Sequence, residues 1–244
     1  MNALLKTAAV KIRDDAEALA TAERLAGHFA TGAAERDAER QLPYGELEQF
    51  SQSGLGGISV PSEHGGAGVS SVTLARVIAR IAQADGSLGQ IPQNHFYALE
   101  VLRVNGSDAQ QRRLYAEVLA GQRFGNALAE LGTRTPLDRN TRLTRTADGY
   151  RIDGRKFYCT GALFAQRIPT LAIDENGVGF LAFVPRQAGG VQVIDDWSGF
   201  GQRTTGSGSV VFDGVAVAAD DVVPFQSAFE LSLIHISEPT RLLS

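Results

Sequence analysis

Apolar side chains in the first half of the chain recur at intervals of three and four residues. Leu19, Ala22, Leu25 and Phe29 form one such stripe, and a second stripe lies between residues 74 and 81. This spacing places the apolar residues of each segment on one face of an α-helix. We therefore predict two helices here, each with one face against a core.

Two further features mark where helices begin. Ser107 and Gln110 have the spacing of a capping box and precede another apolar stripe. A glycine-rich stretch at residues 65–68 is followed by Ser70 and Ser71, whose side chains are typical N-caps. We predict a helix after each of these starts.

From about Phe124 onward the apolar residues alternate with polar ones, which is the period of a β-strand. Asp148-Gly149, Asn176-Gly177 and Asp213-Gly214 separate alternating segments, and such dipeptides favour tight hairpin turns. We predict about six short antiparallel strands, with turns at all three dipeptides.

The two patterns together predict an α+β chain. We expect an N-terminal all-α domain over residues 1–121, followed by an antiparallel β-barrel domain over residues 122–223. The 244 residues suffice for two domains, and the 43% hydrophobic and 20% charged content is that of a folded protein.

Charge and composition exclude several function classes. The net charge of -4, with scattered basic residues, gives no footprint for nucleic acid or an anionic membrane. Lys6, Lys11 and Arg13 interrupt the apolar N-terminus, which argues against a signal peptide, and no apolar run is long enough to span a membrane. We expect a cytoplasmic protein without membrane or nucleic-acid partners.

Cysteine and histidine usage argues against a metal site. Cys159 is the only cysteine, so one chain forms neither a disulfide nor a cysteine-based metal cluster. No histidine and acidic pair has the spacing of metal ligands. We predict no metal site.

The last residues form a separate segment. Residues 231–241 resemble the translation of a transposase sequencing adapter, so we expect residues 231–244 to be a library artefact. Residues 224–230 would then begin a further helical domain that is interrupted near Glu230. The alternative is a native C-terminal tail.

Two polar segments are the best candidates for a ligand site. Residues 126–130 mix an amide with small side chains, and residues 156–161 combine two aromatic rings, a thiol, a hydroxyl and a glycine. A planar ring such as a flavin needs flat apolar walls, donors at its carbonyls and close backbone approach. The alternative is that Phe157 and Tyr158 are ordinary strand core and that Thr160 is a turn residue.

Two other features allow a functional or a structural interpretation. The glycine-rich residues 199–209, with Arg203, would suit a phosphate or form a structural loop. His95 stands at the start of a predicted helix, where an imidazole suits proton transfer, although a lone histidine is more often structural.

Four segments in order resemble the acyl-CoA dehydrogenase superfamily, over nearly the whole chain up to Glu230. Residues 58–68 resemble its Pro-Glu-x-x-Gly-Gly-x-Gly signature and residues 127–130 its flavin-contacting Ala-Leu-Thr-Glu segment. Residues 156–161 resemble its Lys-x-Trp-Ile-Thr-Asn strand beside the flavin, and residues 210–217 its closing strand. The resemblance implies that fold, without its C-terminal four-helix bundle.

Departures from the common pattern narrow the resemblance. Ala129 stands where the family has a flavin-bonding threonine, and the loop that follows differs. Residues 85–96 and 195–203 look closest to the sulfur-acquisition oxidoreductases, which are similar to dibenzothiophene monooxygenases. Those enzymes take reduced FMN from a separate flavin reductase and use oxygen to oxidise an organosulfur compound.

The resemblance also implies roles for single residues. His95 would be an active-site histidine, Asn126 a flavin-side amide with a catalytic role, and Tyr97 a weaker catalytic candidate. The cofactor would be flavin, FMN or FMNH2 rather than FAD. The residues expected to hold it are Asn126, Leu128, Ala129, Phe157, Tyr158, Cys159, Thr160, Arg203, Ser207 and Ser209, of which Arg203, Ser207 and Ser209 would hold its phosphate unless that loop only closes the barrel.

Two alternatives remain open at this point. An FAD-dependent acyl-CoA dehydrogenase would take an acyl-CoA substrate, and the missing bundle would hold the residue that distinguishes it. A truncated chain would instead be an inactive flavin- or partner-binding fragment with exposed apolar faces. The full-length form is expected to be a homodimer or homotetramer.

Overall fold

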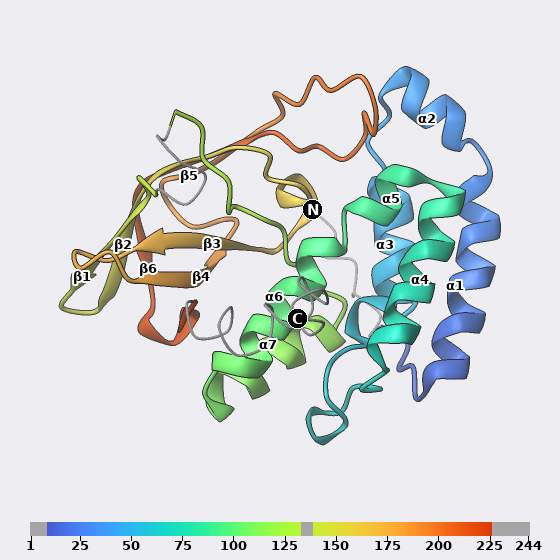
Figure 1. The fold of residues 1–244 in the computed structure, drawn as a ribbon, viewed down its shortest axis with the longest axis horizontal. Coiled ribbons are helices and arrows are strands. Elements are labelled where there is room, and N and C mark those ends of the chain that lie inside the picture. Colours follow the sequence, from blue (N-terminus) through green and yellow to red (C-terminus); the bar gives the residue numbers. More distant parts are fainter. Residues whose placement is uncertain (1–8, 133–138, 226–244) are drawn as a thin grey trace, which may run out of the picture.

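The computed structural model describes residues 9–132 and 139–225 of the chain. Within these residues the N-terminal half is helical and the C-terminal half forms one sheet (Figure 1). The α-helices are α1 (Asp15–Ala30), α2 (Ala33–Glu39), α3 (Tyr44–Gln52), α4 (Ser71–Ala84), α5 (Gly86–Gln90), α6 (Gln93–Asn105) and α7 (Asp108–Leu119). The predicted α+β class is confirmed.

Helix starts follow the local sequence signals. Ser70 caps α4 by accepting from the backbone N–H of Thr73, and Ser107 forms the complete capping box with Gln110. The helices predicted from both starts, and the helix that includes His95, are confirmed.

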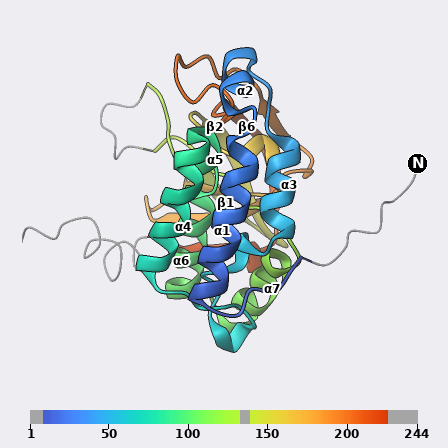
Figure 2. The same ribbon diagram turned by 90° about the vertical axis from the view of Figure 1, so that its right-hand side faces the viewer.

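Helices α1 and α4 lie side by side (Figure 2). Ala18, Ala22 and Ala26 of α1 are fully buried, as are Val77 and Ile81 of α4. Small side chains on one helix let the larger side chains of the other fill the space between them. The predicted stripes are therefore the buried faces of this pair.

Among the described residues, the sheet contains seven strands in the order β5-β6-β2-β1-β3-β4-β7. Its strands are β1 (Arg142–Thr146), β2 (Gly149–Lys156), β3 (Arg167–Ile173), β4 (Gly179–Pro185), β5 (Val191–Ile194), β6 (Ser209–Val217) and β7 (Val222–Pro224). Hairpins at Asp148-Gly149 and Asn176-Gly177 are confirmed by the β1–β2 and β3–β4 pairings. The sheet is not purely antiparallel as predicted, because β1 runs parallel to β3 where Arg142 pairs with Ile173.

The turn predicted at Asp213-Gly214 is wrong. Strand β6 continues through both residues, and its pairing with β2 shifts register between Ile152 and Gly154. β6 is paired on both sides, by β5 and β2. The ladder with β2, which includes Phe212 before the dipeptide and Val215 after it, therefore outweighs the local turn preference, and a bulge accommodates the dipeptide.

Strand β4 joins two hydrophobic cores because its side chains alternate between the faces of the sheet. Leu181 and Phe183 pack with the helices, while Ala182 and Val184 pack within the sheet half. Phe183 meets Phe124 edge to face at a centroid distance of 5.3 Å. The seam between the two halves is thus filled by apolar side chains.

Ion pairs fix the sheet against the helices at two places. Arg167 of β3 binds Glu117 of α7 and Asp221, with its Nε 2.6 Å from a Glu117 carboxylate oxygen. At the other end, Arg40 binds Asp195, where the loop after β5 reaches α2 (Figure 1). Both contacts hold one relative arrangement of the two halves.

The structure does not test the predictions for the end of the chain or for the domain limits. The predicted start of a further helical domain and the adapter-like segment fall outside the described residues, apart from the first two positions. The domain limits at residues 121 and 223 stay predictions. In the described ranges, no helix is both long and apolar enough to cross a membrane.

Candidate functional site

The backbone carbonyl of Tyr158 is the point where two predicted site residues meet. The Asn126 side-chain amide donates to it at 3.1 Å, and the backbone N–H of Thr160 donates to it at 2.9 Å. Asn126 comes from the segment after the helices and Thr160 from the turn that follows β2. The fold therefore brings together the two polar segments that the sequence singled out.

Tyr158 holds a strained backbone conformation at this point. Its φ angle is 55°, in the left-handed region that bulky residues rarely adopt. Tyr158 is 52% exposed, and its ring meets the Trp197 ring edge to face at a centroid distance of 6.3 Å. Strained backbone conformations cluster at functional sites. The Asn126 hydrogen bond helps to hold this conformation.

A chain of hydroxyl groups leads away from Thr160. The Thr160 and Ser207 hydroxyl oxygens lie 2.7 Å apart, and Ser207 donates to Thr205 at 2.8 Å. Thr205 donates to the Gln202 carbonyl at 3.1 Å. The three hydroxyl-bearing residues are almost fully buried. We call the hydroxyls of Thr160, Ser207 and Thr205, together with the Gln202 carbonyl, the hydroxyl chain.

The amide of Asn126 is only half satisfied. Its nitrogen donates to Tyr158, but its buried Oδ1 has no hydrogen-bond partner among the described residues. Since buried polar atoms are nearly always paired, an orphaned acceptor indicates a missing donor. Asn126 therefore offers a place for a ligand N–H or O–H.

A buried ion pair supports the same segment from behind. Lys156 and Glu130 are 0% and 3% exposed, with Nζ and Oε1 2.6 Å apart. Lys156 also donates to the Leu128 carbonyl, and the Phe157 N–H donates to the Ala129 carbonyl. The segment holding Leu128 and Ala129 is thus fixed along the end of β2.

Burial acts on the pKa values of both Lys156 and Glu130. It lowers the pKa of Lys156, against the opposing effect of Glu130. Burial opposes ionisation of Glu130 as well, but Lys156 and the backbone N–H groups of Asn140 and Thr141 outweigh it and hold the Glu130 pKa below its ordinary value. Sequence reasoning missed this pair, although both charges stand in the quoted motif segments.

His95 is engaged on both sides by the protein itself. Its Nε2 lies 2.8 Å from the Gly56 carbonyl, and its Nδ1 lies 3.0 Å from the Phe124 backbone N–H. A carbonyl only accepts and an N–H only donates, so the ring is neutral with its proton on Nε2. Burial lowers its pKa to about 4. The hollow beside it measures about 20 Å³, too small for a ring.

This geometry favours the structural interpretation of His95. The ring connects α6, the 3-10 turn Leu55–Gly57 and the segment that enters the sheet half. It positions that entry two residues before Asn126. The catalytic role stays a prediction that these two hydrogen bonds do not support.

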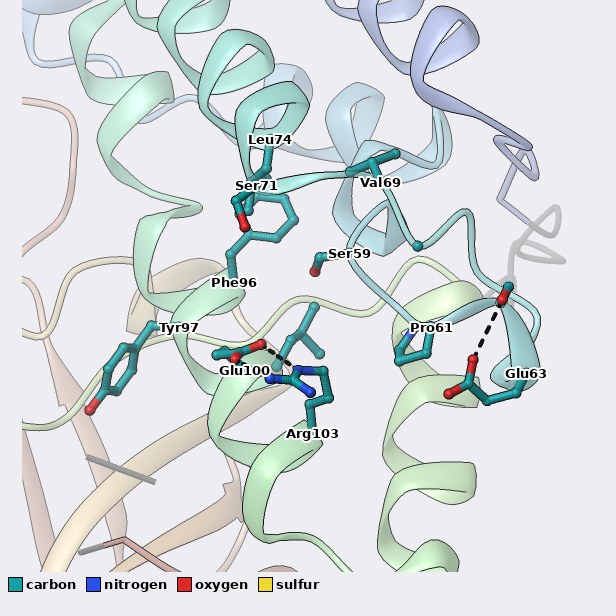
Figure 3. A pocket seen from close by; sticks show the side chains of 13 residues that line it. Ser59, Pro61, Glu63, Val69, Ser71, Leu74, Phe96, Tyr97, Glu100 and Arg103 are labelled. Carbon is teal, nitrogen blue, oxygen red and sulfur yellow. Dashed lines mark hydrogen bonds and ion pairs between the residues drawn. The ribbon is translucent and has the colours of Figure 1, made fainter. Parts of the chain in front are cut away.

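Tyr97 lies elsewhere, at a cavity of about 610 Å³ (Figure 3). Ser59 lies between Phe96 and Pro61 there, and the Tyr97 phenol points away from them. None of the predicted flavin-side residues lines this cavity. Burial raises the pKa of Tyr97 to about 12, so the phenol stays protonated. The structure does not bring Tyr97 together with Asn126.

The residues predicted to hold a phosphate have partners within the protein. The Arg203 guanidinium donates to the Ala38 carbonyl at 2.8 Å, and Ser209 donates to Asp196 at 2.8 Å. Ser207 belongs to the hydroxyl chain. These contacts connect the loop to α2 and to itself, which matches the structural alternative for this loop.

The remaining predicted residues lie beside Tyr158. The Phe157 ring lies 4.9 Å from the Arg155 guanidinium, and Cys159 is buried. Burial raises the pKa of the Cys159 thiol to about 12, which keeps it protonated. Within the described ranges, no group of three or more potential ligand side chains could hold a metal ion.

Comparisons with known proteins place the chain among flavoprotein relatives. Residues 11–122 match the family described as acyl-CoA dehydrogenase, N-terminal domain. A dibenzothiophene monooxygenase of Rhodococcus erythropolis is 35% identical over 235 residues, covering 93% of this chain and 56% of that protein. A probable FMNH2-dependent monooxygenase, SfnC, of Pseudomonas putida is 32% identical over 210 residues, covering 84% and 51%.

A solved structure extends the comparison to three dimensions. FMN-bound TdsC from Paenibacillus sp. A11-2 superposes with a TM-score of 0.81 at 34% identity, covering 87% of this chain and 56% of that chain. The chain therefore spans about half the length of the curated relatives and the structure that it matches.

Proposed function

Because the chain belongs to the acyl-CoA dehydrogenase superfamily, in the branch of the dibenzothiophene and FMNH2-dependent monooxygenases, we propose that it acts as a reduced-flavin-dependent monooxygenase of organosulfur compounds. The observation that carries the proposal is the meeting of Asn126 and Thr160 at the strained Tyr158 carbonyl. FMN is the proposed flavin, since TdsC binds FMN.

The residues around Tyr158 fit an isoalloxazine ring. The unpartnered Asn126 Oδ1 suits an N–H of the ring, and the exposed Tyr158 ring, with the half-buried Trp197 ring edge to face against it, offers a flat apolar wall. The ion pair of Lys156 and Glu130 keeps the backbone beside them in place. When bound, a reduced flavin supplies the two electrons that activate oxygen.

The protein's own groups have positioning roles in this proposal. Asn126 and Thr160 orient the ring edge, and His95 fixes the chain that carries Asn126. Burial around Thr160 and Ser207 excludes water from that edge, where water would compete with the protein for hydrogen bonds to the ring. A separate flavin reductase as partner, and a small organosulfur substrate, complete the proposal.

Ala129 gives a reason to prefer this function over an acyl-CoA dehydrogenase. The resemblance places a flavin-bonding threonine at this position, and alanine has no hydroxyl to bond with. The Ala129 backbone still pairs with Phe157. The site therefore keeps its frame but lacks one side-chain donor of that enzyme class.

Binding of FMN by the purified chain tests the proposal. We expect the chain to quench FMN fluorescence in an anaerobic titration and the Asn126→Leu variant to bind at least tenfold more weakly. Gln192→Ala, which removes an exposed amide on β5, serves as the control and should bind as the parent does. Equal binding by the parent and Asn126→Leu would refute this site.

A second assay tests the reaction. The chain is supplied with FMN, a flavin reductase, ¹⁸O₂ and a panel of organic sulfides and sulfones. One ¹⁸O atom in a product, absent without the chain, supports a monooxygenase. FMN binding without labelled product across the panel favours the inactive fragment instead.

A further inference from the structure

Helix α2 and the loop between β5 and β6 meet at both ends of the segment that carries Trp197 (Figure 1). Before Trp197, the Arg40 guanidinium at the C-cap of α2 donates to the Asp195 carboxylate at 3.1 Å. After it, the Arg203 backbone N–H donates to the Asp37 carboxylate at 3.0 Å, and the Arg203 guanidinium donates to a carbonyl of α2. Helix α2 therefore holds this loop on both sides of the tryptophan.

The loop in turn seats Trp197 beside Tyr158. The Trp197 Nε1–H donates to the Gln202 carbonyl at 3.1 Å, and the Trp197 ring meets the Tyr158 ring edge to face. Gly199 lies so close to the Trp197 ring that a Cβ there would stand 2.3 Å from it, so only glycine fits. Residues 195–208 include no helix or strand, so side-chain contacts rather than strand pairing hold the loop.

Backbone strain is concentrated along this path. Among the described residues, the non-glycine residues with a positive φ are Arg40 at 52°, Gln202 at 47° and Tyr158 at 55°. Each of them takes part in one of the contacts that join α2 to the Tyr158 ring. Strain of this kind persists only where the surrounding structure holds it. The three positions therefore belong to one arrangement that the fold maintains.

Helix α2 is itself fixed by a buried arginine. Arg36 is 9% exposed and makes ion pairs with Asp85 at 3.0 Å and with Glu46 at 3.2 Å. The Asp85 carboxylate also caps α5 by accepting from the Ser87 and Leu88 backbone N–H groups. The helix cannot shift without breaking this buried network, which makes it a rigid support for the loop.

We propose that α2 is a positioning element of the flavin site and that Arg40 and Asp37 are its positioning residues. The proposal rests on the proposed function above. By holding both ends of the loop, the two residues set Trp197 against Tyr158 before any flavin arrives. A loop that is already ordered adds little entropic cost to binding, whereas a loose loop must be ordered by the ligand. Both residues act through the loop, without contact to the flavin.

Trp197 reports on this arrangement directly, because it is the only tryptophan of the chain. In Arg40→Asp, two carboxylates face each other and the loop loses its anchor before Trp197, so acrylamide should quench the tryptophan fluorescence more strongly than in the parent. FMN binding should weaken by about fivefold, the contribution of one exposed ion pair. The Arg40 and Asp195 side chains are 30% and 34% exposed, so urea unfolding should hardly change. Asp37→Ala removes the other anchor and should shift the quenching and FMN binding in the same direction.

Exchanging the two charges separates the ion pair from the loss of a side chain. Arg40→Asp combined with Asp195→Arg restores the attraction and should return both the quenching and the FMN dissociation constant toward the parent values. Arg80→Asp is the matched control, since Arg80 forms an exposed ion pair with Glu23 between α4 and α1. It should leave both measurements unchanged.

The possible failures of this inference and of the proposed function are distinct. Unchanged quenching in Arg40→Asp would show that α2 does not hold the loop and would overturn the inference. Increased quenching with unchanged FMN binding would overturn it as well, because the loop would then not matter to the flavin. In both cases the parent binds FMN and the proposed function stands. Absence of FMN binding in the parent would overturn the proposed function and, with it, the role assigned to α2.

Discussion

His95 provides a sharp test because its two hydrogen bonds make it a buried, neutral group. In His95→Asn the shorter amide can still accept from the Phe124 N–H, but the Gly56 carbonyl loses its 2.8 Å partner. An unsatisfied buried carbonyl costs about 1–3 kcal/mol. We therefore expect the variant to be less stable than the parent by roughly that amount at neutral pH.

The same residue predicts a dependence on pH. Unfolded His95 takes up a proton near its ordinary pKa of 6.5, while burial lowers the folded pKa to about 4. The unfolded state thus binds more protons between these values, so stability is complete above the upper value and is lost as the pH falls toward the lower. Over that range the parent should lose about 3 kcal/mol relative to His95→Asn.

Urea unfolding at a series of pH values measures this difference. His28→Asn, at an exposed histidine of α1, is the matched control for replacing a histidine by asparagine. Parallel stability curves for the parent and His95→Asn would refute a buried neutral imidazole. They would favour the predicted role of His95 in proton transfer.

Three other substitutions or reactions test the supports of the site. Lys156→Met strands the Glu130 carboxylate in the core and should destabilise the chain by about 3–5 kcal/mol in urea unfolding, and a smaller loss would contradict the burial of the pair. Cys159, with its pKa raised to about 12, should react with a thiol reagent near pH 8 only in urea, and rapid reaction of the folded chain would contradict its burial. Tyr158→Gly relieves the strain of a positive φ, so it should lower the free energy of unfolding by no more than about 1 kcal/mol while it weakens FMN binding. A larger loss of stability with unchanged FMN binding would mean that the tyrosine is purely structural.

The parts of the fold that could be predicted rest on local signals. Ser70 and Ser107 cap helices because capping depends on residues three positions apart. The turn at Asp213-Gly214 failed for the opposite reason. Pairing on both sides of β6 joins segments far apart in the sequence, and no local preference reports it.

The candidate site was also predictable only as far as local sequence signals reach. Asn126, Tyr158 and Thr160 were found from their residue types and the family resemblance. Their geometry was not, because the contact of Thr160 with Ser207 spans 47 positions and the strain at Tyr158 depends on how the segments meet. The choice between a structural and a catalytic His95 stayed open in the sequence, since its partners Gly56 and Phe124 become visible only in the folded chain.

The central claim is that a flavin ring binds at the carbonyl of Tyr158. The most direct measurement is the change in ¹H–¹⁵N chemical shifts of the labelled chain on adding reduced FMN under nitrogen. We predict the largest changes at the Asn126 side-chain amide and the backbone amides of Tyr158 and Thr160. Changes centred instead on the cavity around Ser59 and Tyr97, with those three signals unmoved, would contradict the account.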